Sequence, residues 1–225
     1  MNQHHLTETA ARTARILFEI KAVMFNAEKP FILTSGSASP VYIDCRKLIS
    51  FPRARRAVID MMCRQLMDNA GHECFDAIAG GETAGISYAA WVSDQLDLPM
   101  LYVRKQPKGF GRMAQIEGDL REGQRVLLVE DLASQGTSKI KFVEALRAAG
   151  AVVEHVAVVF NYDIFDKSDA TMRQLGVKLH GLCTWHDMLA VAREQKAFDA
   201  KTLVEVEKFL QNPEDWSLAH GGKAA

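Results

Sequence analysis

The segment VLLVEDLASQGTS, Val126 to Ser138, decides the fold that we expect for this chain. An apolar run typical of a buried strand ends in two adjacent carboxylates, Glu130 and Asp131, and a hydroxyl-rich turn then leads into a helix. This order aims free backbone N–H groups, the positive end of a helix dipole and three hydroxyls at one point. The segment therefore predicts a phosphate-binding loop, formed by Leu132, Ala133, Ser134, Gln135, Gly136, Thr137 and Ser138.

This loop differs from two common phosphate loops. A Walker loop has a lysine directly before its Ser or Thr, and a dinucleotide fingerprint reads GxGxxG; neither pattern is present. The run LLVED also resembles the start of a receiver domain with Asp131 as phosphoacceptor, but such a domain begins near this strand, and here several elements precede it. A purely structural reading, with acids ending a strand and Ser134 capping a helix, explains each residue alone but not the combination.

The acid pair restricts the ligand further. Two acids beside a phosphate cost electrostatic energy unless another group uses them. The hydroxyls of a ribose donate hydrogen bonds to carboxylates, and Mg²⁺ usually binds through water and substrate oxygens. We therefore expect a phosphorylated ribose as ligand and Mg²⁺ as cofactor. The substrate should hold the ion, with water bridges to Glu130 and Asp131 and no direct side-chain ligand.

The flanking sequence predicts an α/β fold with an open, mostly parallel sheet. Near-continuous apolar runs at 75–80, 99–105, 125–131 and 153–160 alternate with amphipathic helices, which is typical of strands covered on both faces. In such sheets ligands bind at the carboxyl ends of the strands. The chemistry should therefore lie in the turns after Gly80, Lys105, Asp131 and Phe160.

The two ends of the chain are expected to form a small cap. Apolar spacing predicts a helix over 13–24, and the Ser-, Gly- and Pro-rich stretch 30–44 predicts strand, loop and strand. A further helix should begin at Ser50 and end at Gly71. We expect one domain, 1–225, with a core of about 50–165 and a cap built from about 1–49 and 166–225, the latter holding a strand-like VKLHGLCT and a helix.

A basic loop follows the second strand. The stretch KQPKGFGRMAQIEGDLREGQ has no helical pattern, and loops of this length in compact domains are usually functional. Four cations fall within nine acid-free residues, and two glycines allow hinging: Arg104, Lys105, Lys108 and Arg112, with Gly109 and Gly111. Such a loop suits a lid that closes over a diphosphate. The alternative is a solvated basic loop.

Composition excludes several classes of protein. The 225 residues carry 27 basic and 28 acidic side chains, so charge gives no reason to expect nucleic acid or membrane as partner. No segment resembles a signal peptide or a bilayer span, and we expect a cytoplasmic protein. The four cysteines are scattered, which predicts free thiols. A metal site at His180, Cys183 and His186 is disfavoured because Gly181 interrupts the spacing and no fourth ligand is near.

At this point the residues resemble a known family. VLLVEDLASQGTS is similar to the phosphoribosyl diphosphate motif of type I phosphoribosyltransferases. The lid RKQPKGFGR…IEG, the turn GGETAGI and the segment LTSGSASPVYIDCRKL together resemble the orotate phosphoribosyltransferases, and they cover most of residues 30 to 165.

The resemblance implies transfer of the 5-phosphoribosyl group from phosphoribosyl diphosphate to orotate, with Mg²⁺, in a homodimer whose lid reaches the neighbouring site. Arg104, Lys105 and Lys108 match lid residues that bind the diphosphate. Glu130 and Asp131 match the acidic pair at the ribose, and the loop 134–138 matches the 5′-phosphate site, with Ser134 also touching orotate. The N-terminal segment should add Ser35 and Tyr42 to the substrate site.

Departures from the family pattern leave one assignment open. Family members carry lysines at the positions of Thr34 and Ala84, a histidine at Phe110, and an orotate-binding arginine near Asn161 or Tyr162. The orotate carboxylate then needs another partner: Arg46, Ser35 or backbone N–H groups of residues 34–39. The alternatives are a phosphoribosyltransferase for another base and a regulator that senses phosphoribosyl diphosphate without catalysis.

Overall fold

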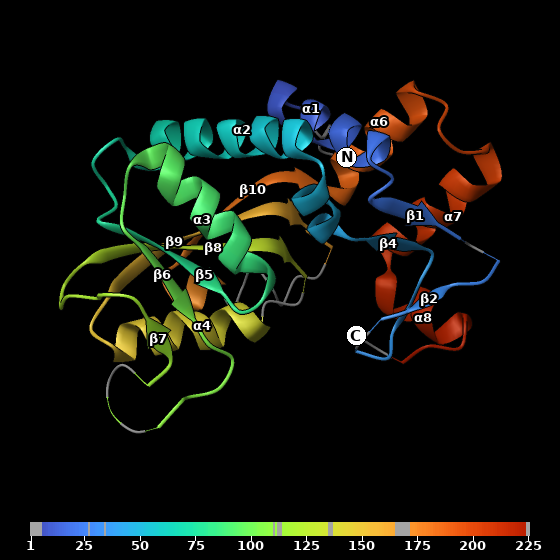
Figure 1. Ribbon diagram of the computed structural model, residues 1–225. Helices are drawn as coiled ribbons and strands as arrows, with labels where there is room; N and C mark the ends of the chain where they lie inside the picture. Colours follow the sequence, from blue (N-terminus) through green and yellow to red (C-terminus); the bar gives the residue numbers. More distant parts are fainter. Residues whose placement is uncertain are drawn as a thin grey trace.

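A six-stranded sheet forms the centre of the molecule (Figure 1). The computed structural model describes residues 6–26, 28–33, 35–109, 111, 114–134, 137–164 and 172–223, without the side chains of residues 137 and 138. The strand order is β10-β9-β8-β5-β6-β7, and every neighbouring pair is parallel except β6 with β7. The strands are β5 (Ala77–Gly81), β6 (Met100–Val103), β7 (Ile116–Glu117), β8 (Arg125–Ala133), β9 (Val152–Asn161) and β10 (Lys178–Thr184).

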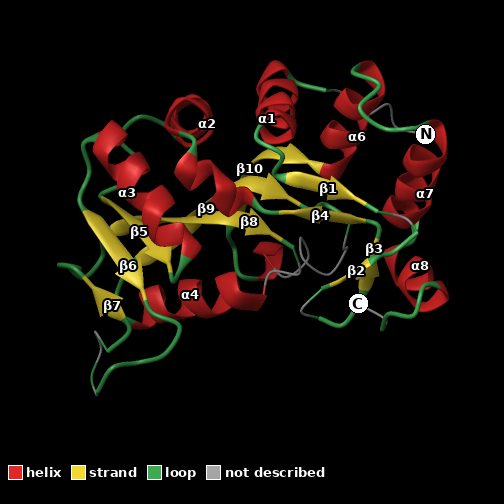
Figure 2. Cartoon of the chain, turned by 45° about the vertical axis from the view of Figure 1, so that its right-hand side comes forward, coloured by secondary structure: helices red, strands yellow, loops and turns green. Residues whose placement is uncertain are grey.

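Helices cover both faces of this sheet, as the sequence predicts. Figure 2 shows α1 (Glu8–Glu19), α2 (Pro52–Ala70) and α3 (Ala84–Leu96) above it, with α4 (Thr137–Ala148) below. Side chains of β8 alternate between two apolar clusters, because successive residues of a strand point to opposite faces. Leu127 and Val129 belong to the cluster under α1 to α3, whereas Val126 and Leu128 belong to the cluster over α4.

A cap lies beside the sheet and combines segments from both ends of the chain. In it, β1 (Val23–Phe25) pairs with β4 (Val41–Ile43), and β2 (Phe31–Ile32) pairs with β3 (Ala38–Ser39). The helices α7 (Ala200–Gln211) and α8 (Pro213–Ala219) complete it. The Ser217 hydroxyl accepts a hydrogen bond from the Ala38 N–H at 2.8 Å and donates one to the Lys223 carbonyl at 2.6 Å. Residues far apart in sequence are thus joined in one small unit.

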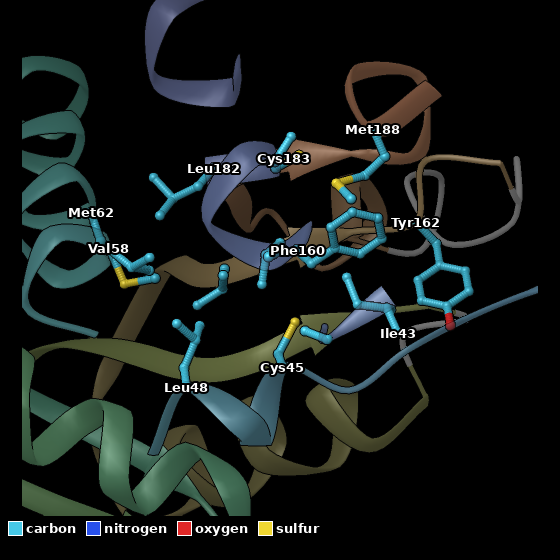
Figure 3. Packing of buried hydrophobic residues seen from close by; sticks show 14 of the residues in the cluster. Ile43, Cys45, Leu48, Val58, Met62, Phe160, Tyr162, Leu182, Cys183 and Met188 are labelled. Carbon is cyan, nitrogen blue, oxygen red and sulfur yellow. The ribbon is translucent and has the colours of Figure 1, made fainter. Parts of the chain in front are cut away.

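One apolar cluster joins the cap to the sheet. Figure 3 shows Ile43 of the cap and Cys45 of the short helix η1 (Cys45–Ser50) beside Phe160 of β9, with Met188 of α6 (Trp185–Glu194) nearby. All four side chains are at most 2% exposed. This packing fixes the end of β4 next to the carboxyl edge of the sheet.

The expected element boundaries require three corrections. The first helix begins at Glu8, capped by the Thr7 hydroxyl, and ends at Glu19, because Lys21 has φ 55° and Val23 already pairs in β1. This helix packs mainly on β10 and α6, and its Phe18 ring also stacks on Phe25 of the cap. The strand predicted in the tail is β10, so the sheet continues beyond residue 165. The helix expected from Ser50 begins at Pro52, after the 3₁₀ helix η1, and Gly71 follows it as predicted.

The four cysteines are free thiols, as their scattered positions predict. Cys45, Cys63, Cys74 and Cys183 are free, and only Cys74 is partly exposed. In the described part of the chain, no helix is both long and apolar enough to span a bilayer.

Two histidines face each other between β9 and β10. His155 Nδ1 and His180 Nε2 lie 2.8 Å apart, so at most one of these nitrogens carries a proton. Burial, with His155 and Lys178 close by, lowers the pKa of His180 from 6.5 to about 4. Burial also lowers the pKa of His155. The pair is therefore neutral in the folded state near pH 7.

We expect this pair to make stability fall in acid. A histidine whose pKa is lower when folded contributes full stability above its unfolded pKa of 6.5 and loses it as pH falls toward 4. The contribution of His180 to the free energy of unfolding should be about 2 kcal/mol smaller at pH 5 than at pH 7.5. Urea unfolding at both pH values should show a smaller pH-dependent loss for His180→Leu than for the natural protein. The exposed His72→Gln is the control, and an unchanged loss in His180→Leu would contradict the assignment.

Candidate active site

A cavity of about 660 Å³ lies at the carboxyl edge of the sheet, between the sheet and the cap. The turns after β5, β6 and β8 contribute to it, as the sequence predicts for ligands of a parallel sheet. Both polar and apolar side chains form its wall: Ile32, Leu33, Ser35, Tyr42, Ile43, Asp44, Arg46, Glu82, Thr83, Ala84, Lys105, Glu130, Asp131, Leu132, Ser134, Phe142 and Tyr162.

The acid pair lies near the carboxyl end of β8. Glu130 is 7% exposed, its carboxylate occupies the space where a Cβ at position 81 would stand, and it lies close to where a Cβ at position 85 would stand. These two glycines make room for a buried carboxylate between β5 and α3. Asp131 Oδ1 accepts a hydrogen bond from the Leu132 N–H at 2.9 Å. Both acids line the cavity and can accept hydrogen bonds from a ligand there.

Burial controls the charge of these acids. It raises the pKa of Glu130 from 4.5 to about 8 and also raises the pKa of Asp131. Lys139 opposes both shifts. Its side chain is only 4% exposed, and it shares the sheet-facing side of α4 with Phe142, three residues later. Burial lowers the pKa of Lys139, and the two acids raise it. The acids and the lysine form one buried electrostatic group.

The phosphate loop follows the acid pair. Leu132 and Ser134 line the cavity, and α4 begins at Thr137, so the N-terminus of this helix is close to the cavity. Ala133 is buried, and its carbonyl accepts a hydrogen bond from the Tyr162 N–H at 2.8 Å, which joins this loop to the end of β9. Gln135, Gly136 and the side chains of Thr137 and Ser138 lie outside the described residues.

The turn after β5 meets the start of the lid. The Glu82 carboxylate accepts a hydrogen bond from the Lys105 N–H at 2.7 Å, and the Glu82 N–H donates to the Val103 carbonyl at 2.9 Å. Lys105 and the turn residues Thr83 and Ala84 line the cavity. A cation, polar backbone and a carboxylate therefore face the cavity at this point.

The lid begins as a narrow hairpin. The Arg104 N–H donates to the Gln115 carbonyl at 2.8 Å, and the Lys108 N–H donates to the Ala114 carbonyl at 2.7 Å. Lys108 is exposed and lies outside the cavity wall. Arg104, which is predicted to bind the diphosphate, pairs with Glu117 of β7 at 3.4 Å in this structure, because the β6–β7 pairing brings the two side chains together. Arg112 and Phe110 lie outside the described residues, as does Thr34 in the cap.

The cap supplies the opposite wall. Tyr42 belongs to β4, Asp44 caps the start of η1, and Arg46 lies in the first turn of η1. Arg46 Nε donates to Asp44 Oδ1 at 2.7 Å. Ser35 and Tyr42, both expected at the substrate site, line the cavity here.

Comparison with known proteins agrees with this geometry. A model of the phosphoribosyl transferase domain matches residues 52–184. The chain is 58% identical over 213 residues to the orotate phosphoribosyltransferase of Dinoroseobacter shibae, covering 95% of this chain and 94% of the relative. The chain belongs to the orotate phosphoribosyltransferase family.

Solved structures of this family and of a longer enzyme have the same fold. The orotate phosphoribosyltransferase of Aeropyrum pernix has a TM-score of 0.68 and 30% identity, and the match covers 83% of this chain and 99% of that one. Leishmania donovani UMP synthase has a TM-score of 0.74 and 30% identity over 89% of this chain, which spans 42% of that protein.

Several contributors to this site were not singled out from the sequence, among them Glu82, Lys139 and Phe142. Glu82 follows β5, and the rule that ligands bind at strand ends points to it. Lys139 and Phe142 share a helix face, and a lysine in an apolar series is a detectable signal. Within the described ranges, no three His, Cys, Asp or Glu side chains are grouped to hold a metal ion, and His180 pairs with His155 instead.

Replacing Lys139 should change the pH dependence of catalysis. Lys139→Met removes the charge that lowers the pKa of Glu130, so this carboxyl stays protonated to a higher pH. The rising limb of kcat/KM against pH, set in the natural protein by a Glu130 pKa of about 8, should move up by about one unit. Lys141→Met, an exposed change on the same helix, should leave the profile in place. An unmoved limb in Lys139→Met would show that Glu130 does not set it.

Proposed function

We propose that the cavity at the carboxyl edge of the sheet transfers the 5-phosphoribosyl group of phosphoribosyl diphosphate to orotate. The products are orotidine 5′-phosphate and pyrophosphate, a step of pyrimidine synthesis. One observation carries this proposal. A buried acid pair, a hydroxyl-bearing loop at a helix N-terminus and a lysine-bearing turn line one cavity, in a chain of the orotate phosphoribosyltransferase family.

The reaction is a substitution at C1 of the ribose. A ring nitrogen of orotate loses its proton to water and forms the new bond to C1 as the bond to the diphosphate oxygen breaks, and positive charge develops on the sugar. Ser134 and the helix N-terminus bind the 5′-phosphate, and Glu130 and Asp131 accept hydrogen bonds from the ribose hydroxyls. Both carboxylates also favour the positive charge of the transition state. The protein contributes mainly position and fixed charge.

Magnesium fits the donor set of this cavity. Four carboxylates line it against two cations: Asp44, Glu82, Glu130 and Asp131, with Arg46 and Lys105. A substrate with three phosphate groups would meet net negative charge there, and Mg²⁺ accepts oxygen ligands from carboxylates, water and phosphates. We propose that Glu130 and Asp131 hold the ion through water. When bound, Mg²⁺ neutralises charge on the diphosphate.

We propose further that the enzyme works as a homodimer in which the lid of one subunit serves the other. Lys108 is exposed and does not line the cavity of its own chain. A lid that reaches a neighbouring site would bring this charge to the diphosphate and exclude water. We place the reaction in the cytoplasm, which suits four free cysteines.

A panel of bases tests the reaction. The purified protein, given phosphoribosyl diphosphate and Mg²⁺, should consume orotate and release pyrophosphate, and excess EDTA should abolish turnover. Product formation followed by chromatography distinguishes the bases. Consumption of uracil or adenine without orotate would establish a phosphoribosyltransferase for another base, and binding of phosphoribosyl diphosphate without any turnover would establish a sensor.

Replacing Lys108 tests the lid. Lys108→Ala should lower kcat by about 100-fold and change the Kd of orotidine 5′-phosphate by less than about threefold, because the lysine acts on the leaving diphosphate only. Arg121→Ala, an exposed cation beyond the lid, is the control. Equal losses in turnover and in nucleotide binding would contradict a role in the transition state.

A further inference from the structure

We propose that Arg46 binds the carboxylate of orotate and so selects this base over uracil, which lacks only that group. This inference rests on the proposed function, and it names the residue responsible for its specificity. Five considerations support it: the direction of attack, the apolar wall of the cap, the donors of Arg46, the occupied donors of the neighbouring loop, and the apolar character of position 162.

The geometry of substitution places the base on the cap side. Ser134, the acid pair and the turn at Thr83 hold the phosphates and ribose on the sheet side of the cavity. An incoming nitrogen approaches C1 from the side opposite the leaving diphosphate. The wall that faces Lys105 and Thr83 across the cavity is formed by the cap and η1. The base therefore lies against the cap.

This wall has the character of a site for a flat ring. Ile32 is 63% exposed, the most exposed large apolar side chain in the described part of the protein, and it lines the cavity. Leu33 and Ile43 lie on the same wall, with Tyr42, whose ring centroid is 5.7 Å from that of Phe31. An apolar side chain held in solvent at a cavity wall is typical of ligand contact.

Arg46 is the cation on this wall. Among described residues only Arg46 and Lys105 bring positive charge into the cavity wall, and the Lys105 N–H is held by Glu82 on the diphosphate side. Arg46 Nε donates a hydrogen bond to Asp44 Oδ1 at 2.7 Å, and Tyr42 Oη lies 3.5 Å from Nη2 of the guanidinium. Within the described ranges Nη1 has no hydrogen-bond partner. The outer edge can therefore bind a carboxylate with two parallel bonds.

Asp44 orients Arg46 and preserves its charge. Its carboxylate accepts from both the backbone N–H and the Nε of Arg46, which fixes the first turn of η1 and the direction of the side chain. The same carboxylate raises the pKa of Arg46. A guanidinium held at one edge loses less conformational entropy on binding a ligand.

Several other candidate donors in the described part of the cap already make hydrogen bonds. The Gly36 N–H donates to the Leu33 carbonyl at 2.8 Å, the Ser37 N–H to Ser35 Oγ at 3.3 Å, and the Ala38 N–H to Ser217 Oγ at 2.8 Å. The Ser35 hydroxyl donates to Ser37 Oγ at 3.0 Å. A carboxylate at this loop would have to break existing bonds, whereas Arg46 offers unused donors.

Position 162 supplies no cation. The ring of Tyr162 is 4% exposed and packs edge-on against Phe160 and Trp185, with centroids 5.7 and 5.6 Å apart. Figure 3 shows this ring beside Ile43, on the border between cap and sheet. Tyr162 therefore closes one end of the base site with an aromatic ring.

Orotidine 5′-phosphate and uridine 5′-phosphate test this inference, because they differ only in the carboxylate. By calorimetry, Arg46→Met should raise the Kd of orotidine 5′-phosphate by about 10- to 100-fold and leave that of uridine 5′-phosphate within twofold. Arg46→Lys should fall between, because it keeps the charge without the planar fork. Arg15→Met is the matched control, since Arg15 pairs with Glu194 at similar exposure on α1.

The outcomes separate the two proposals. If Arg46→Met weakens both nucleotides equally, or neither, the inference is wrong although the natural protein still converts orotate. If the natural protein does not convert orotate at all, the proposed function itself fails, and nucleotide preference is then irrelevant. Arg46→Met should also raise KM for orotate much more than KM for phosphoribosyl diphosphate, and equal increases would contradict a role at the base.

Discussion

The buried carboxylate of Glu130 determines much of the structure around it. Removing an acid from water disfavours its charged form, and neighbouring elements compensate in different ways. The β5–α3 turn has glycines where side chains would overlap the acid, and α4 brings Lys139 to the opposite side. These contacts hold the ends of β5 and β8 and the start of α4 close together. In the proposed mechanism the 5′-phosphate and the ribose are bound at these three elements, and the diphosphate is bound by the lid that follows β6.

The cavity has a second wall that comes from a separate part of the chain. In the proposed mechanism the sheet side binds the groups that every phosphoribosyl transfer shares, and the cap binds the acceptor base. Ala84 and Tyr162, where the chain departs from the family pattern, line the cavity from the start of α3 and the end of β9, and not from the cap. The acid pair is present beside both changes.

The sequence predicted the core better than the cap. Strands β5, β6, β8 and β9 were recognised because each is a near-continuous apolar run, and the motif at Glu130 and Asp131 placed the site at their carboxyl edge. Strands β1, β2 and β3 have only two or three residues each and are too short for periodicity to be informative. The turn at Lys21 and the pairing of Arg104 with Glu117 depend on tertiary contacts, which no local pattern encodes.

The bridge made by Ser217 has a consequence for how the protein is assembled. The sheet and its helices come from a nearly continuous region, 52–184, whereas the base wall requires Ala38 to meet a hydroxyl 179 residues away. During synthesis the phosphate-handling core can collapse while the cap still lacks its second half. The proposed base site is therefore completed after the elements that are proposed to bind the phosphate and the ribose.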